Sequence, residues 1–487
     1  MSKSRQAFGS AQRGAPHGFL ASAVAAEGLF IRTAEIPAWL EARRSVHRFS
    51  IRQIPFAELT GWRFDPHTGN LGHASGRFFT IEGLEVRSDY PTPAVSYQPI
   101  INQPEIGILG ILAKRFDGVL HFLIQAKMEP GNINLVQLSP TVEATKSNYT
   151  QVHGGRRPRY LEYFLERSRG RVLVDQLQSE QGAFFLRKRN RNMIVETLDD
   201  VPVHEDFCWL TLSQIKAMLQ RNDLVNMDTR TVISGIPLAS SEEEASGLGF
   251  RRESGQGGGF EQDLLGSALS REGVVMDNDE IISWFTELKA TSDIQARRIA
   301  LRELPAWSKD DLSIHREDGR FFSVIAVAVE ADSREVAGWS QPIVQPCSRG
   351  TTAFITKRID GVLHFLIQAR MEPGMFDMFE LAPTVQYLPG SAAPGSADVP
   401  PYFYDLVANA PRACIRHESI QSEEGGRFYH YQNRNVVIEL DEAQELELPR
   451  GYLWMTLGQI HEFLRYNNYF NIEARGLLAC LGVGGVL

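Results

Sequence analysis

The chain contains 487 residues, of which 43% are hydrophobic and 22% are charged, fractions that are ordinary for a soluble globular protein. Its formal net charge of −9 argues against a general nucleic-acid binder, which usually has a basic patch or a high pI. No apolar run approaches the ~18 residues of a membrane-spanning helix, and the four widely spaced cysteines indicate a reduced, cytoplasmic protein without a structural zinc.

The first 38 residues are expected to form a flexible N-terminal tail. Basic residues precede an apolar run at residues 19–26, an arrangement that resembles a weak signal peptide. The run is short, however, and His17 and Gly18 interrupt its start. We therefore favour a tail over an export signal.

One long segment of the chain occurs twice. Residues 117–131 read DGVLHFLIQAKMEPG, and residues 360–374 repeat them with a single Lys-to-Arg change. The offset is 243 residues here (360 minus 117) and 245 nearer the ends of each copy, as between Trp39 and Trp284. Each copy is long enough to have its own hydrophobic core. The sequence thus predicts two similar domains that face each other about a pseudo-two-fold axis.

The duplication divides the chain into four parts. Residues 1–38 are the tail, 39–238 the first repeat, 239–283 a linker and connecting segment, and 284–487 the second repeat. The linker assignment depends on residues 240–259, which are rich in Ser, Glu and Gly. These glycines follow no strand and lack the G-x-G-x-x-G pattern, so no nicotinamide-binding signature is visible and no cofactor is expected.

Each repeat is predicted to be rich in strands with helices at its ends, which makes the fold α+β. In the first repeat we expect a helix and loop at 39–59, then a Gly-rich loop that carries Trp62 and a strand at 77–86. A hairpin of strands at 106–116 and 119–128 should follow. A short helix at 159–167 and strands at 171–176 and 184–196 complete the expected elements. Asp117-Gly118 is a preferred type I′ hairpin turn, because both turn positions need φ > 0. Thr211 and Gln214 form a capping box that begins a final helix, and Thr456 with Gln459 repeats it.

Polar side chains share one face of the second hairpin strand. His121, Gln125, Lys127 and Glu129 lie on this face because side chains alternate along a strand. They could form a polar ladder that lines a cleft, or the solvated face of a sheet. For His121 and Gln125 alone we favour the solvated face.

The two repeats differ most after Val142 and Val385. The first continues with hydroxyls, amides, a phenol, an imidazole and three cations over residues 143–157, whereas the second continues with a Pro/Gly/Ala loop over residues 386–395. Cations among hydroxyls suit an anionic, hydroxyl-rich ligand such as a phosphate ester. The alternative is a solvated polar loop.

A series of motifs in the first repeat resembles the NDP-hexose 2,3-dehydratases of deoxysugar biosynthesis. They lie at residues 98–100, 118–132, 136–142, 145–150 and 153–155, and the resemblance covers nearly the whole chain, including the duplication. It implies two Nudix-like mixed α/β halves. The Nudix box, a helix whose carboxylates bind metal, is absent from both repeats, so no metal and no metal-dependent diphosphate hydrolysis are expected.

The resemblance implies that the protein removes water across carbons 2 and 3 of dTDP-4-keto-6-deoxy-D-glucose. The 4-ketone acidifies the hydrogen on carbon 3, so a base forms an enolate, the 2-hydroxyl leaves with the help of an acid, and a 3,4-diketo-2,6-dideoxy sugar results. Two alternatives stay open: an epimerase or isomerase that reprotonates the same enolate, and a non-catalytic nucleotide-sugar-binding protein. A downstream 3-ketoreductase and a homodimer are the implied partners.

The implied reaction needs a base, an acid, an oxyanion donor and groups that bind the diphosphate, and several residues are candidates for these roles. The catalytic candidates are Glu129, Lys146, Tyr149 and His153, and the substrate-binding candidates are Trp62, Thr145, Lys146, Ser147, Asn148, Tyr149, Arg156, Trp307, Arg320 and Lys357.

Each candidate carries an expected role. His153 titrates near neutrality and Glu129 would need its pKa raised by burial, so either could be the base. Tyr149 would protonate the leaving hydroxyl or hold the ketone oxygen. The equivalent residues Trp62 and Trp307 could each stack on thymine or belong to the core. Arg320 and Lys357 could complete a nucleotide site between the halves, form a vestigial second one, or make surface ion pairs.

Overall fold

Each repeat builds one large mixed sheet of its own. The computed structural model describes residues 18–146, 157–239, 245–246, 259–334, 336–392 and 397–483. The first large sheet contains β6 (Gly107–Phe116), β7 (Val119–Met128), β8 (Val136–Ser139), β9 (Val142–Ala144), β10 (Arg171–Ser179), β11 (Arg189–Glu196) and β12 (Phe207–Leu210). The second contains β18 (Gly350–Ile359), β19 (Val362–Met371), β20 (Phe379–Ala382), β21 (Val385–Tyr387), β22 (Ile415–Ser422), β23 (Gln432–Glu439) and β24 (Tyr452–Thr456).

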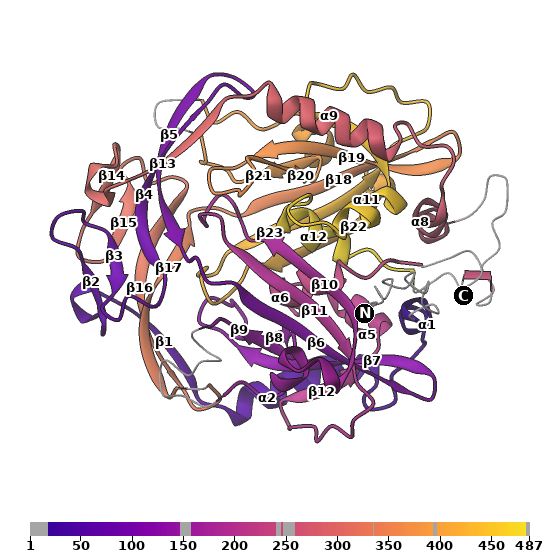
Figure 1. Ribbon diagram of the computed structural model, residues 1–487, viewed down its shortest axis with the longest axis horizontal. Helices are drawn as coiled ribbons and strands as arrows, with labels where there is room; N and C mark the ends of the chain where they lie inside the picture. The colour runs from indigo at the N-terminus through magenta and orange to yellow at the C-terminus, as the bar shows by residue number, and fades with distance from the viewer. Residues whose placement is uncertain are drawn as a thin grey trace, which may run out of the picture.

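The two large sheets have the same strand order. In each, one parallel pair (β6 with β11, β18 with β23) lies among antiparallel pairs. Figure 1 shows these sheets in the two halves of the molecule, with α6 (Met227–Ile233) and α12 (Ile472–Ala479) in contact between them. The predicted mixed α/β class with two repeated halves is therefore confirmed.

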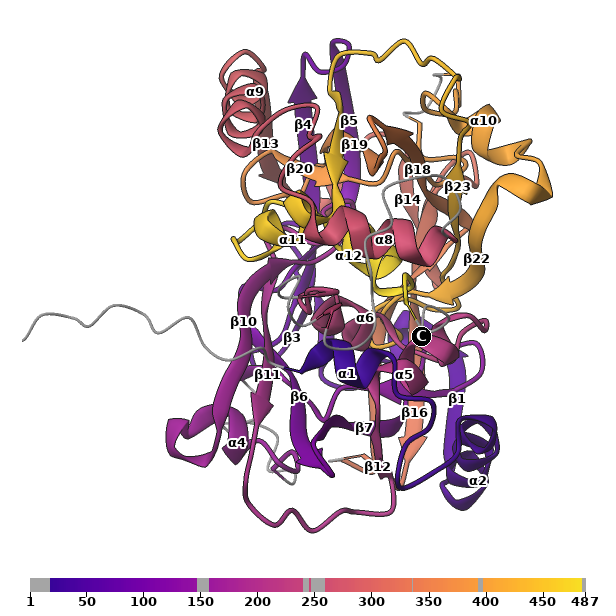
Figure 2. The same ribbon diagram turned by 90° about the vertical axis from the view of Figure 1, so that its right-hand side faces the viewer.

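The two smaller sheets are shared between the repeats. β1 (Phe49–Ile54) of the first repeat pairs with β16 (Phe322–Ala331) of the second, next to β14 (Trp307–Lys309), β15 (Ser313–Arg316) and β17 (Gly338–Pro346). Reciprocally, β13 (Ile294–Ile299) pairs with β4 (Thr80–Ser88), next to β2 (Trp62–Phe64), β3 (Leu71–His73) and β5 (Ala94–Asn102). Figures 1 and 2 show β1 alongside β16. The first strand of each repeat thus belongs to a small sheet whose other strands come from the other repeat.

The predicted hairpin is confirmed. β6 and β7 pair in antiparallel register about Asp117 and Gly118, whose φ angles of 48° and 84° are those of a type I′ turn. The predicted capping boxes are confirmed as well, because Thr211 caps α5 (Leu212–Leu219) and Thr456 caps α11 (Leu457–Leu464) with both side-chain bonds in place. Of the remaining helices, α4 (Glu162–Leu165) confirms the predicted short helix, and α9 (Asn278–Ala290) and α10 (Tyr404–Ala408) belong to the second repeat.

The prediction for residues 39–59 was wrong in its second part. α2 (Ile36–Val46) is the expected helix, but β1 replaces the expected loop. β1 is stabilised by the edge of β16, which lies more than 260 residues further along the chain, and periodicity within the segment contains no information on that partner. Trp62 likewise lies on the short strand β2 and not on a loop.

The packed structure begins before residue 39. Phe19 and Leu20, placed in the tail by the sequence, are buried in α1 (Phe19–Ala23) against β7 and α5. Ser22 accepts a hydrogen bond from the Leu212 amide and donates one to the Leu120 carbonyl. Ser267 of α8 (Phe260–Leu269) makes the equivalent pair of bonds in the second repeat. The repeat thus extends about 20 residues further toward the N-terminus than its tryptophans indicate.

No helix of the described residues is both long enough and apolar enough to cross a membrane.

Candidate active site

A cavity of about 450 Å³ opens at the end of β7 in the first repeat. Its walls come from both repeats. The first repeat contributes the aromatic rings of Trp62, Phe78 and Phe79, and the second contributes Trp339 and Gln341 near the start of β17. A cavity of this size with apolar walls and a few convergent polar groups is typical of a small-molecule site.

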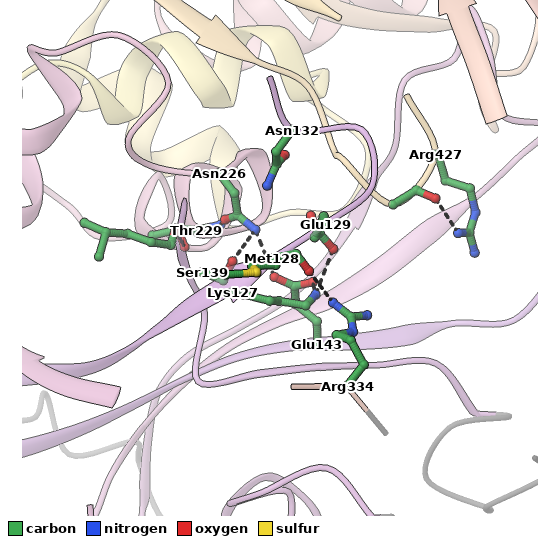
Figure 3. A network of polar contacts seen from close by, with 12 residues as sticks. Lys127, Met128, Glu129, Asn132, Ser139, Glu143, Asn226, Thr229, Arg334 and Arg427 are labelled. Atoms are coloured by element: carbon green, nitrogen blue, oxygen red, sulfur yellow. Dashed lines mark hydrogen bonds and ion pairs between the residues drawn. The ribbon is translucent and has the colours of Figure 1, made fainter. Parts of the chain in front are cut away.

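A buried ammonium group connects two carboxylates in the wall of the cavity (Figure 3). Lys127 Nζ donates to Glu129 Oε1 at 2.9 Å and to Glu143 Oε2, and its side chain is only 11% exposed. Lys127, near the end of β7, and Glu129, directly after the strand, lie on the same side, as the sequence predicted, and β9 brings Glu143 alongside. Charges removed from water in this way are stable only when they are paired.

The N-cap of a helix fixes the orientation of Glu143. Asn226 accepts a hydrogen bond from the Thr229 amide at 2.8 Å, and this bond caps α6. The amide nitrogen of the same side chain donates to Glu143 Oε1 and to Ser139 Oγ, each at 2.9 Å (Figure 3). The carboxylate of Glu143 therefore has a donor on each oxygen and is held in place.

Neighbouring cations keep Glu129 ionised. Burial alone would raise the pKa of its carboxyl, but Lys127 and Arg334 outweigh burial, and the pKa lies below its ordinary value. In return, burial would lower the pKa of the Lys127 ammonium, but Glu129 and Glu143 raise it above its ordinary value. The raised pKa that Glu129 would need as the base is therefore not found, because cations that the sequence did not reveal lie close to it.

Other carboxyls of the cavity are shifted the opposite way. Burial raises the pKa of Asp228, in the first turn of α6, well above its ordinary value, and Glu143 and Glu424 add to this. Burial raises the pKa of Glu424 to about 8, although Arg427 opposes it. Carboxyl groups with opposite shifts in one cavity can supply an acid and a base at the same pH.

Further cations line the cavity. Burial lowers the pKa of Lys188 to about 8, and its ammonium donates to the Glu105 carbonyl. Arg427 donates to Gln103 Oε1 and lies 4.5 Å from the Phe79 ring centroid. Arg334 donates to the Met128 carbonyl at 2.9 Å. This set of donors suits an anionic group such as a diphosphate.

The structure brings together only part of the predicted site. Glu129, Trp62 and Thr145 line the cavity, and Lys146 follows Thr145 directly. The indole of Trp62 donates to the Ser340 carbonyl of the second repeat at 2.9 Å. The predicted residues Ser147, Asn148, Tyr149, His153 and Arg156 lie outside the described residues.

Three predicted residues of the second repeat lie away from this cavity. Trp307 is buried in the core, where its indole donates to the Tyr97 carbonyl at 2.9 Å. Arg320 is exposed beside Asp318. Lys357 is half-buried and donates to the Gln444 carbonyl at 2.8 Å.

His121 is neither solvated nor part of the cavity lining. It is 1% exposed, because Phe30 and Phe116 pack against its ring. Its Nδ1 bonds to the Val119 carbonyl at 3.0 Å. The prediction of a solvated face was wrong at this position because residues 29–30 cover the strand, and these residues had been assigned to the tail.

Sequence reasoning missed several polar residues of the cavity. They are Glu143, Asp228 and Lys188 of the first repeat and Arg334, Glu424 and Arg427 of the second. A comparison of the repeats could have indicated several of them, since Glu143 aligns with Gln386, Glu424 with Gln181 and Arg427 with Phe184. Among the described residues, no group of three or more His, Cys, Asp or Glu side chains has the arrangement of a metal site.

The fold and the cavity together define a class: a tandem-repeat α/β protein with a polar cavity lined by both repeats. The family model for NDP-hexose 2,3-dehydratase matches residues 33–236 and 278–481, once for each repeat, and the chain belongs to this family.

Named relatives cover nearly the whole chain. It is 48% identical over 94% of its length to a dTDP-4-dehydro-6-deoxy-alpha-D-glucopyranose 2,3-dehydratase of Amycolatopsis orientalis, 92% of which is covered. It is 48% identical over 95% of its length to a protein of the same name from Saccharopolyspora spinosa, 94% of which is covered. A third, from Streptomyces violaceoruber, is 45% identical over 92% of this chain and 97% of its own length.

Proposed function

We propose that this protein is a dTDP-4-keto-6-deoxy-D-glucose 2,3-dehydratase, a hydro-lyase of deoxysugar biosynthesis. The observation that carries the proposal is the family membership of both repeats, together with 48% identity to named dehydratases over most of the chain. The cavity supports it, because its aromatic, cationic and acidic groups match a base, a phosphate and a hydroxyl-rich sugar.

The cavity supplies groups for each part of the substrate. Trp62 and the neighbouring rings offer a surface on which thymine stacks. Arg334, Arg427 and Lys188 offer donors for the diphosphate. Lys146, Ser147, Asn148 and Arg156 keep the substrate-binding role that the sequence suggests. A nucleotide could be bound by Arg320, Lys357 and Trp307 only at a second location, away from this cavity.

The reaction starts with removal of the proton from carbon 3. In this proposal His153 or Glu129 accepts it, and the charge of the enolate on the ketone oxygen is balanced by Lys146 or Tyr149. Glu129 is ionised and able to accept a proton, but the cations that lower its pKa also make it a weaker base. This favours His153 as the base, with Glu129 and Lys127 holding the sugar hydroxyls.

We further propose that the halves are Nudix-like and related by a pseudo-two-fold axis. The equivalent contacts of the two repeats support this axis. β1 of the first repeat pairs with β16 of the second, and β13 of the second pairs with β4 of the first. Ser22 and Ser267 make the same hydrogen bonds in their own repeats. A homodimer and a downstream ketoreductase that consumes the labile diketo product belong to the same proposal.

The test is incubation of the pure protein with dTDP-4-keto-6-deoxyglucose in D₂O, with and without EDTA, followed by mass spectrometry. We expect loss of one water, unaffected by EDTA, with dTDP released as the product decays. Deuterium uptake without water loss would instead indicate an epimerase. Binding without any chemical change would leave a non-catalytic nucleotide-sugar-binding protein.

A further inference from the structure

Each repeat inserts one loop into the other repeat. The loop at residues 180–188, between β10 and β11, meets Gly374, whose amide donates to the Gly182 carbonyl at 2.7 Å. The loop at residues 423–431, between β22 and β23, meets Gly131, whose amide donates to the Gly425 carbonyl at 2.7 Å. The loop of the second repeat thereby becomes part of the cavity in the first.

The two inserted loops differ in chemistry. The second repeat places Glu424 and Arg427 at the cavity, where the first repeat has Gln181 and Phe184 at the equivalent positions. Gln181 donates to Glu423 Oε2 at 2.6 Å, and Phe184 is buried in the core. A shared fold requires neither the acid nor the cation, so their presence on only one loop points to a function in the cavity.

From this asymmetry we infer that Glu424, supplied by the second repeat to the cavity of the first, is the acid that protonates the departing 2-hydroxyl. The inference rests on the proposed dehydratase function and assigns one catalytic residue of it.

The carboxyl of Glu424 lies close to the Lys127–Glu129 pair. A Cβ atom added at Gly426 would lie 2.8 Å from Glu424 Oε1 and 3.6 Å from Glu129 Oε1. Both carboxyl groups therefore border the position beside Gly426 that a larger residue would fill. Among the described residues, no side chain or amide donates a hydrogen bond to the Glu424 carboxyl.

Protonation of Glu424 fits this location. Burial raises its pKa to about 8, while Lys127 and Arg334 hold the pKa of Glu129 below its ordinary value. At neutral pH the cavity thus contains a protonated carboxyl beside an ionised one, which is the arrangement that an elimination needs.

Glu424 acts in the second half of the elimination. After the base has taken the proton from carbon 3, the enolate electrons form the bond between carbons 2 and 3 and restore the 4-ketone. The bond between carbon 2 and its oxygen breaks, Glu424 gives its proton to that oxygen, and water leaves. Glu424 remains as a carboxylate and regains a proton from solvent, while the enol product relaxes to the diketone.

The decisive variant is Glu424→Gln, which keeps the size of the side chain and loses the transferable proton. We expect water loss to slow by about 10²–10⁴-fold, the usual contribution of a general acid. Proton abstraction does not need Glu424, so NMR of the recovered substrate in D₂O should show deuterium at carbon 3. Affinity for dTDP should stay within about twofold of wild type.

Two further variants complete the experiment. Glu424→Asp keeps the proton on a shorter arm and should restore part of the water loss. Glu445→Gln, an exposed change in the same repeat, serves as the matched control and should behave as wild type.

The outcomes separate the inference from the function. Absence of water loss in wild type would overturn the dehydratase proposal itself. Wild-type water loss in Glu424→Gln would overturn the acid assignment while the function stands. Loss of both water release and carbon-3 exchange, with dTDP binding intact, would make Glu424 the base and equally overturn the assignment.

Discussion

At the scale of single residues, the cavity depends on charges that compensate one another. Lys127 serves two carboxylates at once, and its side chain, like theirs, is at most about a tenth exposed. The sequence placed Lys127 and Glu129 on one face of a strand, and the structure confirms this. It did not reveal Glu143 or Arg334, because those residues come from other strands and loops.

Replacement of Lys127 tests this balance. Lys127→Met preserves length but leaves Glu129 and Glu143 without their shared cation, so the free energy of unfolding should fall by about 3–5 kcal/mol. Urea titration followed by circular dichroism measures it. Lys127→Arg is the matched control, since Arg370 occupies the equivalent position and bonds to Glu372 at 3.0 Å. Equal losses in both variants would contradict the explanation.

At the scale of elements, the inserted loops need glycine at their docking points. A Cβ atom at Gly131 would lie 1.6 Å from the Phe428 carbonyl oxygen, and one at Gly374 would lie 1.8 Å from that of Phe185. Backbone cannot move aside as a flexible side chain can. These glycines belong to the repeated motif Glu-Pro-Gly, and the sequence alone did not indicate that this motif contacts the inserted loop.

Gly131→Ala should displace the loop at residues 423–431. We expect the free energy of unfolding to fall by about 1–3 kcal/mol or more, the usual cost of overpacking. We also expect a larger loss of dehydratase activity than this destabilisation explains, because Glu424 and Arg427 move with the loop. Gly266→Ala is the control: nothing lies within 4 Å of its added Cβ, and in helix α8 alanine should stabilise by about 0.5–1 kcal/mol. Unchanged activity in Gly131→Ala would refute the docking argument.

At the scale of the whole molecule, the proposed repeats are not independent units. Both smaller sheets contain a strand from the other repeat, and the largest core cluster contains residues of both. A repeat on its own would expose the unpaired edge of β4 or β16 and the core surface behind it, which favours aggregation.

We therefore expect one cooperative unfolding transition for the full chain. Tryptophan fluorescence and circular dichroism should give the same denaturant midpoint. Fragments 18–239 and 259–483 should be unfolded or aggregated when expressed separately and should gain structure when expressed together. Two separate transitions, or a folded single fragment, would show that the strand exchange is dispensable.

The sequence by itself determined the duplication, the hairpin, the capping boxes and the family. These features depend on neighbours in the chain or on direct comparison of residues: a type I′ turn needs only Asp117 and Gly118, and a cap needs only Thr211 and Gln214. Glu129 and Trp62 could be named because they lie in such local motifs.

Only the tertiary structure decided which residues meet. Nothing near β1 specifies β16 as its partner, and nothing near Glu424 indicates that it lies in the cavity of the other repeat. The physical reason is that strand pairing, burial and pKa shifts arise from groups far apart in the sequence. The cations that lower the pKa of Glu129 are Lys127, two positions away in the chain, and Arg334 and Arg427 of the second repeat.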